Sequence, residues 1–467
     1  MSIFKKQVIW LCMVLLASTA GAQKTVAKHE LSIEQAVVYA NKNNVQVKIA
    51  LLAIQTQMQT NREITAAALP SLTGSIGTQH FPNIAVQTLP NFISPATYQV
   101  LVDEGVKDGS GNPIKFPGNF DFIQAQFGTK WNASAGISLQ QLLFDGQVFV
   151  GLQARKAAIE FQTTGSKVTE TIIKSNVYKV YYQLVVSKTQ IDLLDANITR
   201  LKKLEHDVKA LYKNGFAERI DIDKIAVQLT NLNTEKLKAL NSIQMGYLGL
   251  KTLMGMPAAD TLVLTDSLNY QQLKEDITST AYNYNDRQDF QYLGLAKKLN
   301  EYNVKRYQLS ALPTVALGAQ YSKIAQRNQF NFFNKGDWFT SSSIGLNIAV
   351  PIFDGFARDA RIKKARIDLQ QTDYQIDNLK LNIDIAVEQS KLKYQSAIAT
   401  MDFQKTNMDL AERVYTQTKK KFEAGTGSNT EINAADLDLK TAQTNYISAL
   451  YDAIIARVDF LTATGKL

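Results

Sequence analysis

Cysteine is almost absent from this chain of 467 residues, which contains a single one, Cys12. It lies inside an apolar run from Val8 to Ala17, not at the end of that run after small residues, a position that does not favour lipid attachment. Disulfides and cysteine-based metal sites are therefore excluded, and the stability of the chain has to come from packing and assembly.

Catalytic motifs are missing as well. The three histidines, His29, His80 and His206, lie far apart in the sequence and fall in three different kinds of predicted element. No H-E-x-x-H, G-x-S-x-G, Walker A or G-x-G-x-x-G pattern occurs in the chain. The sequence therefore predicts neither an enzyme nor a bound cofactor or metal ion.

Basic residues outnumber acidic ones, 51 against 42, which gives a formal net charge of +9. A nucleic-acid-binding protein would concentrate that excess in basic blocks, and only short ones occur, such as Lys419-Lys420-Lys421. We interpret that block as the solvated face of a helix. The sequence thus predicts no nucleic-acid partner.

The chain begins with the pattern of a secretory signal peptide. Lys5 and Lys6 precede the apolar run, and Ala20-Gly21-Ala22 forms a small-residue A-x-A site before Gln23. Residues 1–22 are therefore predicted to be a removed signal peptide, and the mature chain is predicted to lie in the cell envelope. After residue 22 no run of about 18 apolar residues occurs, so no transmembrane helix is predicted. A membrane crossing would have to use strands.

The most informative feature is an internal duplication. Three landmarks occur in the same order in both halves of the chain, which indicates two copies of one structural unit. Ala68-Leu69-Pro70 recurs as Ala311-Leu312-Pro313, Phe144-Asp145-Gly146 recurs as Phe353-Asp354-Gly355, and residues 215–255 align with residues 425–465 without a gap. We predict a first repeat over residues 23–257, an inter-repeat linker over 258–274 and a second repeat over 275–467.

Each half is predicted to run as helix, strand, loop, strand, very long helix, turn and helix. Ser32 and the glutamine three residues later form a capping box, and apolar positions continue until Pro70, which predicts a first helix over about residues 32–68. Residues 147–213 and 356–424 contain no proline and carry apolar residues seven apart, as in a coiled coil. At about 1.5 Å per residue such helices reach on the order of 100 Å, too long for a compact globule.

Four segments alternate apolar and polar residues with the period of two that is typical of strands. They lie at about residues 71–80, 131–140, 314–322 and 340–350. Between the first two, residues 81–130 are rich in proline, glycine, asparagine and phenylalanine and show no helical period. That composition predicts a long surface loop.

Four strands are too few for a closed membrane barrel, which needs at least about eight. Two interpretations remain open: several copies pool their strands into one barrel, or the strands form a small soluble sheet. Trp131, Trp338 and Phe339 lie where strands meet loops, the position that an aromatic girdle at a membrane surface requires.

Each long helix is predicted to end at a glycine turn and to be followed by a returning helix, so each half ends in a helical hairpin tip. In a ring of copies, Asp221 and Glu431 would form acidic rings that favour cations at a pore mouth. In an isolated helix, the same carboxylates would only interact favourably with the positive end of the helix dipole. The tips lie near residues 214–221 and 424–431, and their candidate functional residues are Asn214, Gly215, Asp221, Gly425, Ser428 and Glu431.

The motifs and their order amount to a family resemblance. Leu-Pro precedes the first strand of each half, and a glycine tip precedes each returning helix. Phe144-Asp145-Gly146 and Pro351-Ile352-Phe353-Asp354-Gly355 look like a strand-to-helix signature, and residues 285–289, with the sequence NDRQD, look like an early-helix segment of a second repeat. In these features the chain, over essentially its whole predicted mature length, resembles the TolC-like outer membrane efflux protein family.

The resemblance implies a mainly α fold with a β-barrel portion. Long coiled-coil-like hairpins would form a periplasmic tunnel, and four strands from each chain would enter a shared 12-stranded barrel of a homotrimer in contact with outer-membrane lipid. The implied partners are a periplasmic membrane-fusion adaptor, docked at the helical tips, and an inner-membrane pump. The implied function is a passive exit duct for small molecules or drugs in a tripartite efflux system of the outer membrane.

The resemblance also extends to single residues of the tips. Glu431 matches the place where family members have a constricting acidic ring, and Asp221 matches a carboxylate that helps to hold the entrance shut. The sequence departs from the family at Gly427, where an arginine partner is expected, and at Asn433 and Ala434, near a second acidic ring. Two other functions remain open: a type I channel that exports proteins, and a soluble periplasmic coiled-coil scaffold.

Overall fold

The computed structural model describes residues 27–267, 273, 274, 277, 281–333 and 336–467. The predicted signal peptide, residues 1–22, lies outside the described residues, as does part of the predicted linker over 258–274. Among the described residues, no helix is both long enough and apolar enough to span a membrane. The chain divides into two compact units.

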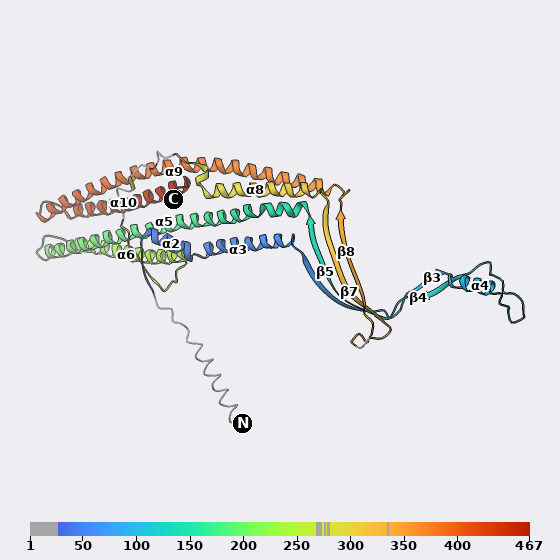
Figure 1. Ribbon diagram of the computed structural model, residues 1–467. Helices are drawn as coiled ribbons and strands as arrows, with labels where there is room; N and C mark the ends of the chain where they lie inside the picture. The colour runs from blue at the N-terminus through green and yellow to red at the C-terminus, as the bar shows by residue number, and fades with distance from the viewer. Residues whose placement is uncertain (1–26, 268–272, 275–276, 278–280, 334–335) are drawn as a thin grey trace, which may run out of the picture. The chain divides into compact units, whose positions relative to one another are not determined.

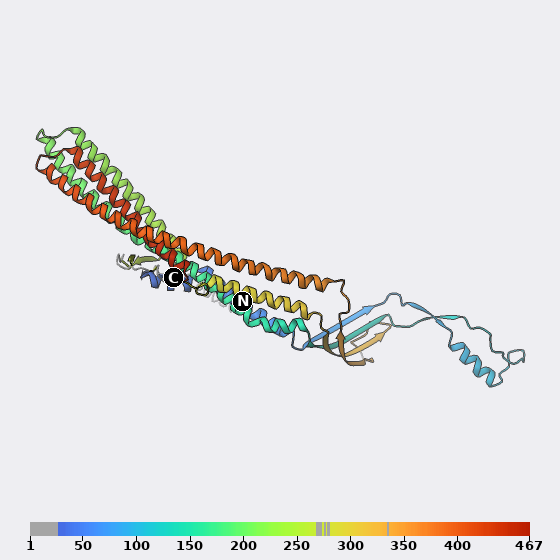
Figure 2. The same ribbon diagram turned by 90° about the horizontal axis from the view of Figure 1, so that it is seen from above.

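Unit 1 is helical and contains the residues up to Gln59, Arg155–Glu301 and Arg366–Leu467. It is built mainly from parts of four long helices (Figure 1, Figure 2). The 68-residue helix α5 is roughly 100 Å long at about 1.5 Å per residue. The four helices are α5 (Gly146–Lys213), α6 (Arg219–Met254), α9 (Ala357–Glu423) and α10 (Asn429–Ala463).

Apolar residues seven apart form the core between these helices. Leu194, Leu201 and Val208 of α5 are all buried, and they pack in one cluster with Ile225 of α6 and Ile432 of α10. A seven-residue repeat keeps one helix face turned toward its neighbours over many turns, which is how a helix of this length buries an apolar seam. The heptad spacing seen in the sequence therefore does position the core.

The predicted helix over 32–68 is wrong at Asn44, where the chain breaks into α2 (Ile33–Asn43) and α3 (Val45–Ala66). The side-chain Oδ1 of Asn44 accepts hydrogen bonds from the backbone nitrogens of Gln46 (2.7 Å) and Val47 (3.2 Å), so this residue caps the second helix. Its Nδ2 donates to the carbonyl of Leu253 at the end of α6, over 2.7 Å. A contact 209 residues away in the chain therefore helps to fix the break.

A two-stranded parallel sheet joins the beginning of the described chain to its middle. Strand β1 (Lys28–Leu31) pairs with β6 (Thr261–Leu264), and the capping box predicted at Ser32 follows directly after β1. The hydroxyl of the fully buried Tyr181 donates to the carbonyl of Leu31 over 3.0 Å. Burial raises the pKa of Tyr181 to about 12. Each strand has four residues, too few for alternation to predict it.

Unit 2 contains Thr60–Ala154 and Tyr302–Ala365. It is built on one antiparallel sheet of four strands in the order β2-β5-β7-β8 (Figure 1). All four strands lie where the alternation predicts them, although β5 and β7 run several residues further than expected. The strands are β2 (Ser71–His80), β5 (Trp131–Phe144), β7 (Thr314–Arg327) and β8 (Phe339–Ala349).

The strand register gives this sheet two chemically different faces. Leu72 lies opposite Leu139, and Leu317 lies opposite Leu346, so most apolar residues of the four strands share one face. That face is uncovered in the single chain, since Ile76 is 91% exposed. The other face is made mainly of serine, threonine, glycine, glutamine and asparagine. Within the described residues, the edge strands β2 and β8 each pair on one side only.

The segment 81–130, expected to be a loop without regular structure, contains a hairpin and a helix. Strands β3 (Val86–Pro90) and β4 (Phe122–Gln126) pair antiparallel, and α4 (Ile93–Asp103) lies between them in the sequence. Pro95 is tolerated there because it stands in the first turn, where its missing N–H has no helical partner. The dense proline and glycine around these short elements conceals their periodicity.

Candidate functional site

The first helical tip closes the turn from α5 to α6. Gly215 has φ of 77°, a left-handed conformation that favours glycine, and its N–H donates to the carbonyl of Tyr212 over 3.0 Å. The next N–H, of Phe216, reaches back to the carbonyl of Leu211 over 2.9 Å. The Asn214 side chain donates to the carbonyl of Ala210 over 2.8 Å. The last carbonyls of α5 are thus satisfied within the turn.

The second tip repeats this design between α9 and α10. Gly425 has φ of 74°, and its N–H donates to the carbonyl of Phe422 over 3.0 Å. The N–H groups of Thr426 and Gly427 both reach the carbonyl of Lys421, over 3.0 and 3.1 Å. Both predicted tips therefore contain a left-handed glycine that ends a long helix, followed closely by a returning helix.

The two tip carboxylates close capping boxes at the starts of the returning helices. Asp221 accepts from the N–H of Glu218 over 3.2 Å, and Glu431 accepts from the N–H of Ser428 over 3.4 Å. In return, the Ser428 hydroxyl accepts from the N–H of Glu431 over 3.2 Å. In the single chain each carboxylate serves its own helix start, so the acidic-ring role depends on further copies.

Apolar packing brings the two tips together, and one ion pair further along the hairpins, Lys440 to Glu235 over 2.7 Å, adds to it. Ile225 at the start of α6 and Ile432 at the start of α10 are fully buried in one cluster, which also includes Tyr415 of α9. That cluster holds the two hairpins side by side within unit 1 (Figure 1, Figure 2). The only ion pair between residues of the first tip that the described structure contains joins Arg219 to Asp223, over 3.3 Å.

A buried polar cluster lies behind the tips, and we did not predict it from the sequence. Asp436 of α10 is 7% exposed, and burial raises the pKa of its carboxyl, an effect that the cations Arg200 and Lys440 partly offset. The Arg200 guanidinium lies over the Tyr415 ring, 5.2 Å from its centre, and donates to Asn197. The sequence signal for this cluster is Asp436 itself, a charged residue within an apolar row of α10.

Two of the three aromatic residues predicted for a girdle lie together. Trp131 and Trp338 both pack against a small cluster on the apolar face of the sheet, where Ala133, Ala325 and Phe332 are buried. Phe339 does not lie with them, because it pairs with Ile324 in β7 and strand alternation turns it to the polar face. A position next to a loop therefore does not determine which face an aromatic residue occupies.

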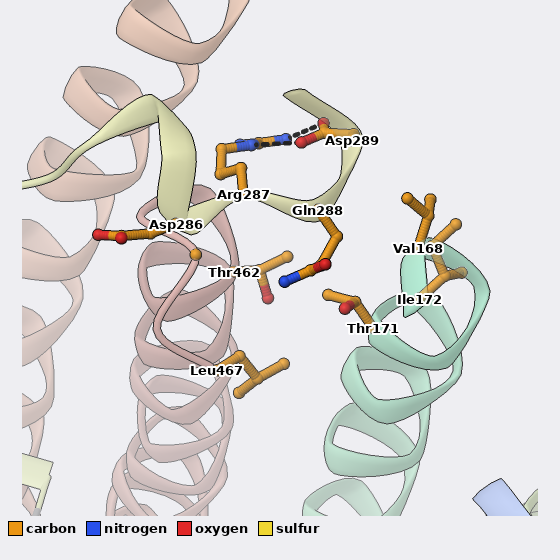
Figure 3. A pocket seen from close by; sticks show the side chains of 10 residues that line it. Val168, Thr171, Ile172, Asp286, Arg287, Gln288, Asp289, Thr462 and Leu467 are labelled. Atoms are coloured by element: carbon orange, nitrogen blue, oxygen red, sulfur yellow. Dashed lines mark hydrogen bonds and ion pairs between the residues drawn. The ribbon is translucent and has the colours of Figure 1, made fainter. Parts of the chain in front are cut away.

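A pocket of about 340 Å³ is lined by residues 286–289 and by residues of α5 and the C-terminal end of the chain (Figure 3). Here a short 3₁₀ turn, η1 (Tyr284–Asp286), leads into α8 (Gln288–Leu309). Arg287 makes two hydrogen bonds to Asp289, of 3.0 and 2.6 Å, and a third to the carbonyl of Ala463 at the end of α10. Through Arg287, the NDRQD segment thus links the start of α8 to the end of α10 by a hydrogen bond. The other lining residues are Val168, Thr171, Ile172, Thr462, Gly465 and Leu467.

The described residues contain no group of three or more histidine, cysteine, aspartate and glutamate side chains that could hold a metal ion. Paired carboxylates do not converge at the pocket either, because Asp289 is engaged by Arg287. The candidate functional features are therefore the capped acidic tips, the packed helical seam and the two-faced sheet.

The chain is similar to known proteins over much of its length. The family model described as "Outer membrane efflux protein" matches residues 262–466. The alkaline protease secretion protein AprF of Pseudomonas aeruginosa is 22% identical over 338 residues, covering 71% of this chain and 68% of AprF. The outer membrane protein TolC of Vibrio cholerae is 20% identical over 339 residues, covering 72% and 77%.

Solved structures extend the likeness over nearly the full length. The crystal structure of CusC, described for its folding and transmembrane channel formation, matches with a TM-score of 0.72 at 14% identity, over 95% of each chain. This match confirms the predicted fold class, in which long helices are combined with strands that belong to a shared barrel.

Proposed function

The chain belongs to the outer membrane efflux protein family, and we propose that three copies of it assemble into one outer-membrane channel. It is an outer-membrane efflux channel protein whose long helices extend into the periplasm. The observation on which the trimer rests is the open, two-faced sheet of four strands. A spanning sheet has to close on itself, because lipid cannot satisfy unpaired backbone groups.

Pooling the strands of several copies would pair the open edges of β2 and β8. Strand β8 of one copy would pair with β2 of the next, and three copies of the four strands make a barrel of twelve. The apolar face, with Ile76 and Ile344 91% and 81% exposed, would then face lipid. The serine-, glycine- and glutamine-rich face would line a polar bore.

We further propose that the chain consists of two structural repeats. The predicted repeats over 23–257 and 275–467 follow the signal peptide of residues 1–22 and are joined by the segment 258–274. Each repeat contains two sheet strands, a helix of 68 or 67 residues, a left-handed glycine and a capping box. The tip positions correspond at a constant offset, since Asp221 and Glu431 occupy the same place in their capping boxes.

The helical tips form the periplasmic entrance in this proposal. A trimer multiplies Asp221 and Glu431 into rings at the mouth, where grouped carboxylates favour cations. The tips stay closed at rest through the apolar cluster that joins the two hairpins. A periplasmic adaptor, linked to an inner-membrane pump, would bind the open form more tightly and shift the population toward it. The channel itself conducts passively, without catalysis or a cofactor.

Conductance in planar bilayers tests this proposal. The purified full-length protein is expected to conduct weakly. The double variant D221A/E431A is expected to conduct several-fold more, because it removes the carboxylate bond of both capping boxes and both acidic rings. D223A is the matched control, since it removes one carboxylate from the same tip and leaves the capping box of Glu218 and Asp221 intact. A double variant that never conducts would rule out a channel gated at the tips.

Protein export is a second candidate. The similarity to AprF, named as an alkaline protease secretion protein, favours it. The two candidates separate in cells that lack this protein. Loss of small-molecule efflux predicts accumulation of a fluorescent efflux substrate in the cell, whereas loss of protein export predicts a secreted protein missing from the medium while dye accumulation is unchanged.

A further inference from the structure

The four strands of the sheet contain only two charged side chains. These are Lys323 and Arg327, four residues apart on β7, while β2, β5 and β8 contain no lysine, arginine, aspartate or glutamate. Both charges are positive. A polar bore could accommodate such charges in water, but the strand register places them on the other face.

Both cations share the apolar face of the sheet. Lys323 pairs with Ala135 on one side and Thr340 on the other, and Arg327 pairs with Trp131. These partners lie on the face of Leu139 and Ile344, because residues paired across strands and residues two apart point the same way. The opposite face contains no charged residue in any of the four strands.

Their place along β7 corresponds to a membrane surface. Lys323 lies nine residues after Thr314, which is about 30 Å along the strand. At a strand tilt of about 40°, that length spans roughly 23 Å of membrane thickness. Arg327 lies about 10 Å further out along the membrane normal. The apolar band of such barrels is about 25 Å tall. If that band begins near Thr314, Lys323 therefore lies at the band's edge and Arg327 at headgroup level.

Arg327 is held in place but lacks an anionic partner among the described residues. Its Nη1 donates to the backbone carbonyl and, over 3.1 Å, to the side-chain oxygen of Asn331. Its guanidinium lies over the Phe332 ring, 5.3 Å from the centre. Its Nη2 is buried without an acceptor. No described carboxylate forms an ion pair with Lys323 or Arg327.

Aromatic side chains gather beside Arg327. His80 stacks on Trp131 with ring centres 4.1 Å apart, and Trp131 meets Phe330 at 4.9 Å. Phe332 meets Trp338 at 6.2 Å and covers the buried Ala325 between the two cations on β7. Aromatic rings with one apolar and one polar edge favour the level between lipid tails and headgroups.

We propose that Lys323 and Arg327 bind the phosphate groups of an anionic lipid in the outer leaflet. Long basic side chains on a lipid-facing surface extend their charge to the headgroups, and the planar guanidinium is suited to phosphate oxygens. The aromatic cluster would pack against the upper acyl chains below that headgroup. This inference rests on the proposed barrel, in which the apolar face contacts lipid and the loop end of the sheet faces outward.

Binding of lipid A to the purified trimer in neutral detergent tests the inference. Trp131 and Trp338, two of the three tryptophans, lie in the cluster, so intrinsic fluorescence reports on the site. The titrants are bisphosphorylated lipid A, lipid A with one phosphate removed, and inorganic phosphate. We expect wild type to bind the bisphosphorylated form roughly 30-fold more tightly than K323Q/R327Q, as two lost surface charges imply.

Two controls make the result specific. K202Q/K203Q removes the same charge from exposed positions of α5 and should bind like wild type, and K323R/R327K keeps both charges and should retain most of the affinity. Equal binding by wild type and K323Q/R327Q, or equally tight binding of inorganic phosphate, would overturn the lipid site. A protein that forms no trimer would instead overturn the proposed barrel, so the two failures are distinguishable.

Discussion

The side-chain amide of Asn197 donates a hydrogen bond to Oε1 of Gln443 over 2.9 Å, and both side chains are buried. Asn197 belongs to α5 and Gln443 to α10, so the bond links the long helix of the first half to the returning helix of the second. Asn197 also accepts from Arg200, which connects this pair to the cluster around Asp436. A polar contact within an apolar seam fixes how two helices align, because a slipped alignment leaves it unpaired.

Removing both partners of this pair should cost less than the sum of the two single losses. N197A leaves Gln443 without a donor, and we expect the free energy of unfolding to fall by about 1–3 kcal/mol, with a similar loss for Q443A. In the double variant the second loss should be smaller, with a coupling energy of about 0.5–3 kcal/mol. Urea unfolding, monitored by circular dichroism, measures the free energy of unfolding of wild type, the two single variants and the double variant. Strict additivity would show that the pair does not act as a unit.

Asp436 should make the stability of the helical tips depend on pH. Its pKa is raised in the folded state because the carboxyl is buried, so the folded protein binds a proton more readily than the unfolded one. The cost of burying the charge is then present above the folded pKa and is relieved as pH falls through it toward the ordinary value of 3.8. D436N, which cannot ionise, should gain stability relative to wild type as pH rises from about 4 to 7.

Unfolding curves of wild type and D436N across that pH range check the prediction. D438N is the matched control, because Asp438 is exposed on the same helix. Its difference from wild type should show little change with pH. A constant difference between D436N and wild type would mean that the buried carboxyl is not the group that titrates.

The left-handed glycines should tolerate alanine poorly. G215A and G425A each place a side chain at a φ above 70°, and we expect each to lower the free energy of unfolding by about 1–2 kcal/mol. Gly249 provides the opposite case, because it lies within α6 and a Cβ added there meets nothing within 4 Å. G249A should raise stability by up to about 1 kcal/mol. Equal effects at Gly215 and Gly249 would contradict the structure of the tips.

Asn44 should contribute to the stability of the fold, because it lies between α2 and α3 and donates a hydrogen bond to the end of α6. N44A removes the cap of α3 and the bond to the carbonyl of Leu253, and we expect a loss of about 1–3 kcal/mol of unfolding free energy. N43A is the neighbouring control, since the Asn43 side chain donates only to the carbonyl of Tyr39 in its own helix. Thermal unfolding measures both. A loss at Asn43 as large as that at Asn44 would argue against the capping role.

The long periodic elements of this fold could be predicted from the sequence, because each repeats one physical pattern many times. The heptads of α5 and α9 and the alternation of β2, β5, β7 and β8 extend over ten or more residues each. The glycine tips could be predicted for a different reason, since a left-handed residue at a helix end favours glycine, which has no Cβ.

Features that depend on distant partners could not be predicted in this way. The break at Asn44 depends on Leu253, and the parallel pair β1 and β6 joins segments more than 200 residues apart. The raised pKa of Asp436 follows from which helices bury it, and the face of Phe339 follows from its register with Ile324. Each needs the tertiary arrangement before its chemistry can be stated.

The shared barrel is tested most directly by the migration of the detergent-extracted outer-membrane protein on a denaturing gel, boiled against unboiled, with its mass in detergent measured by light scattering. The account predicts a species of three chains, each of 52.0 kDa before any processing, that collapses to the monomer only on boiling. A protein that is monomeric before boiling and is recovered in the soluble fraction would contradict it.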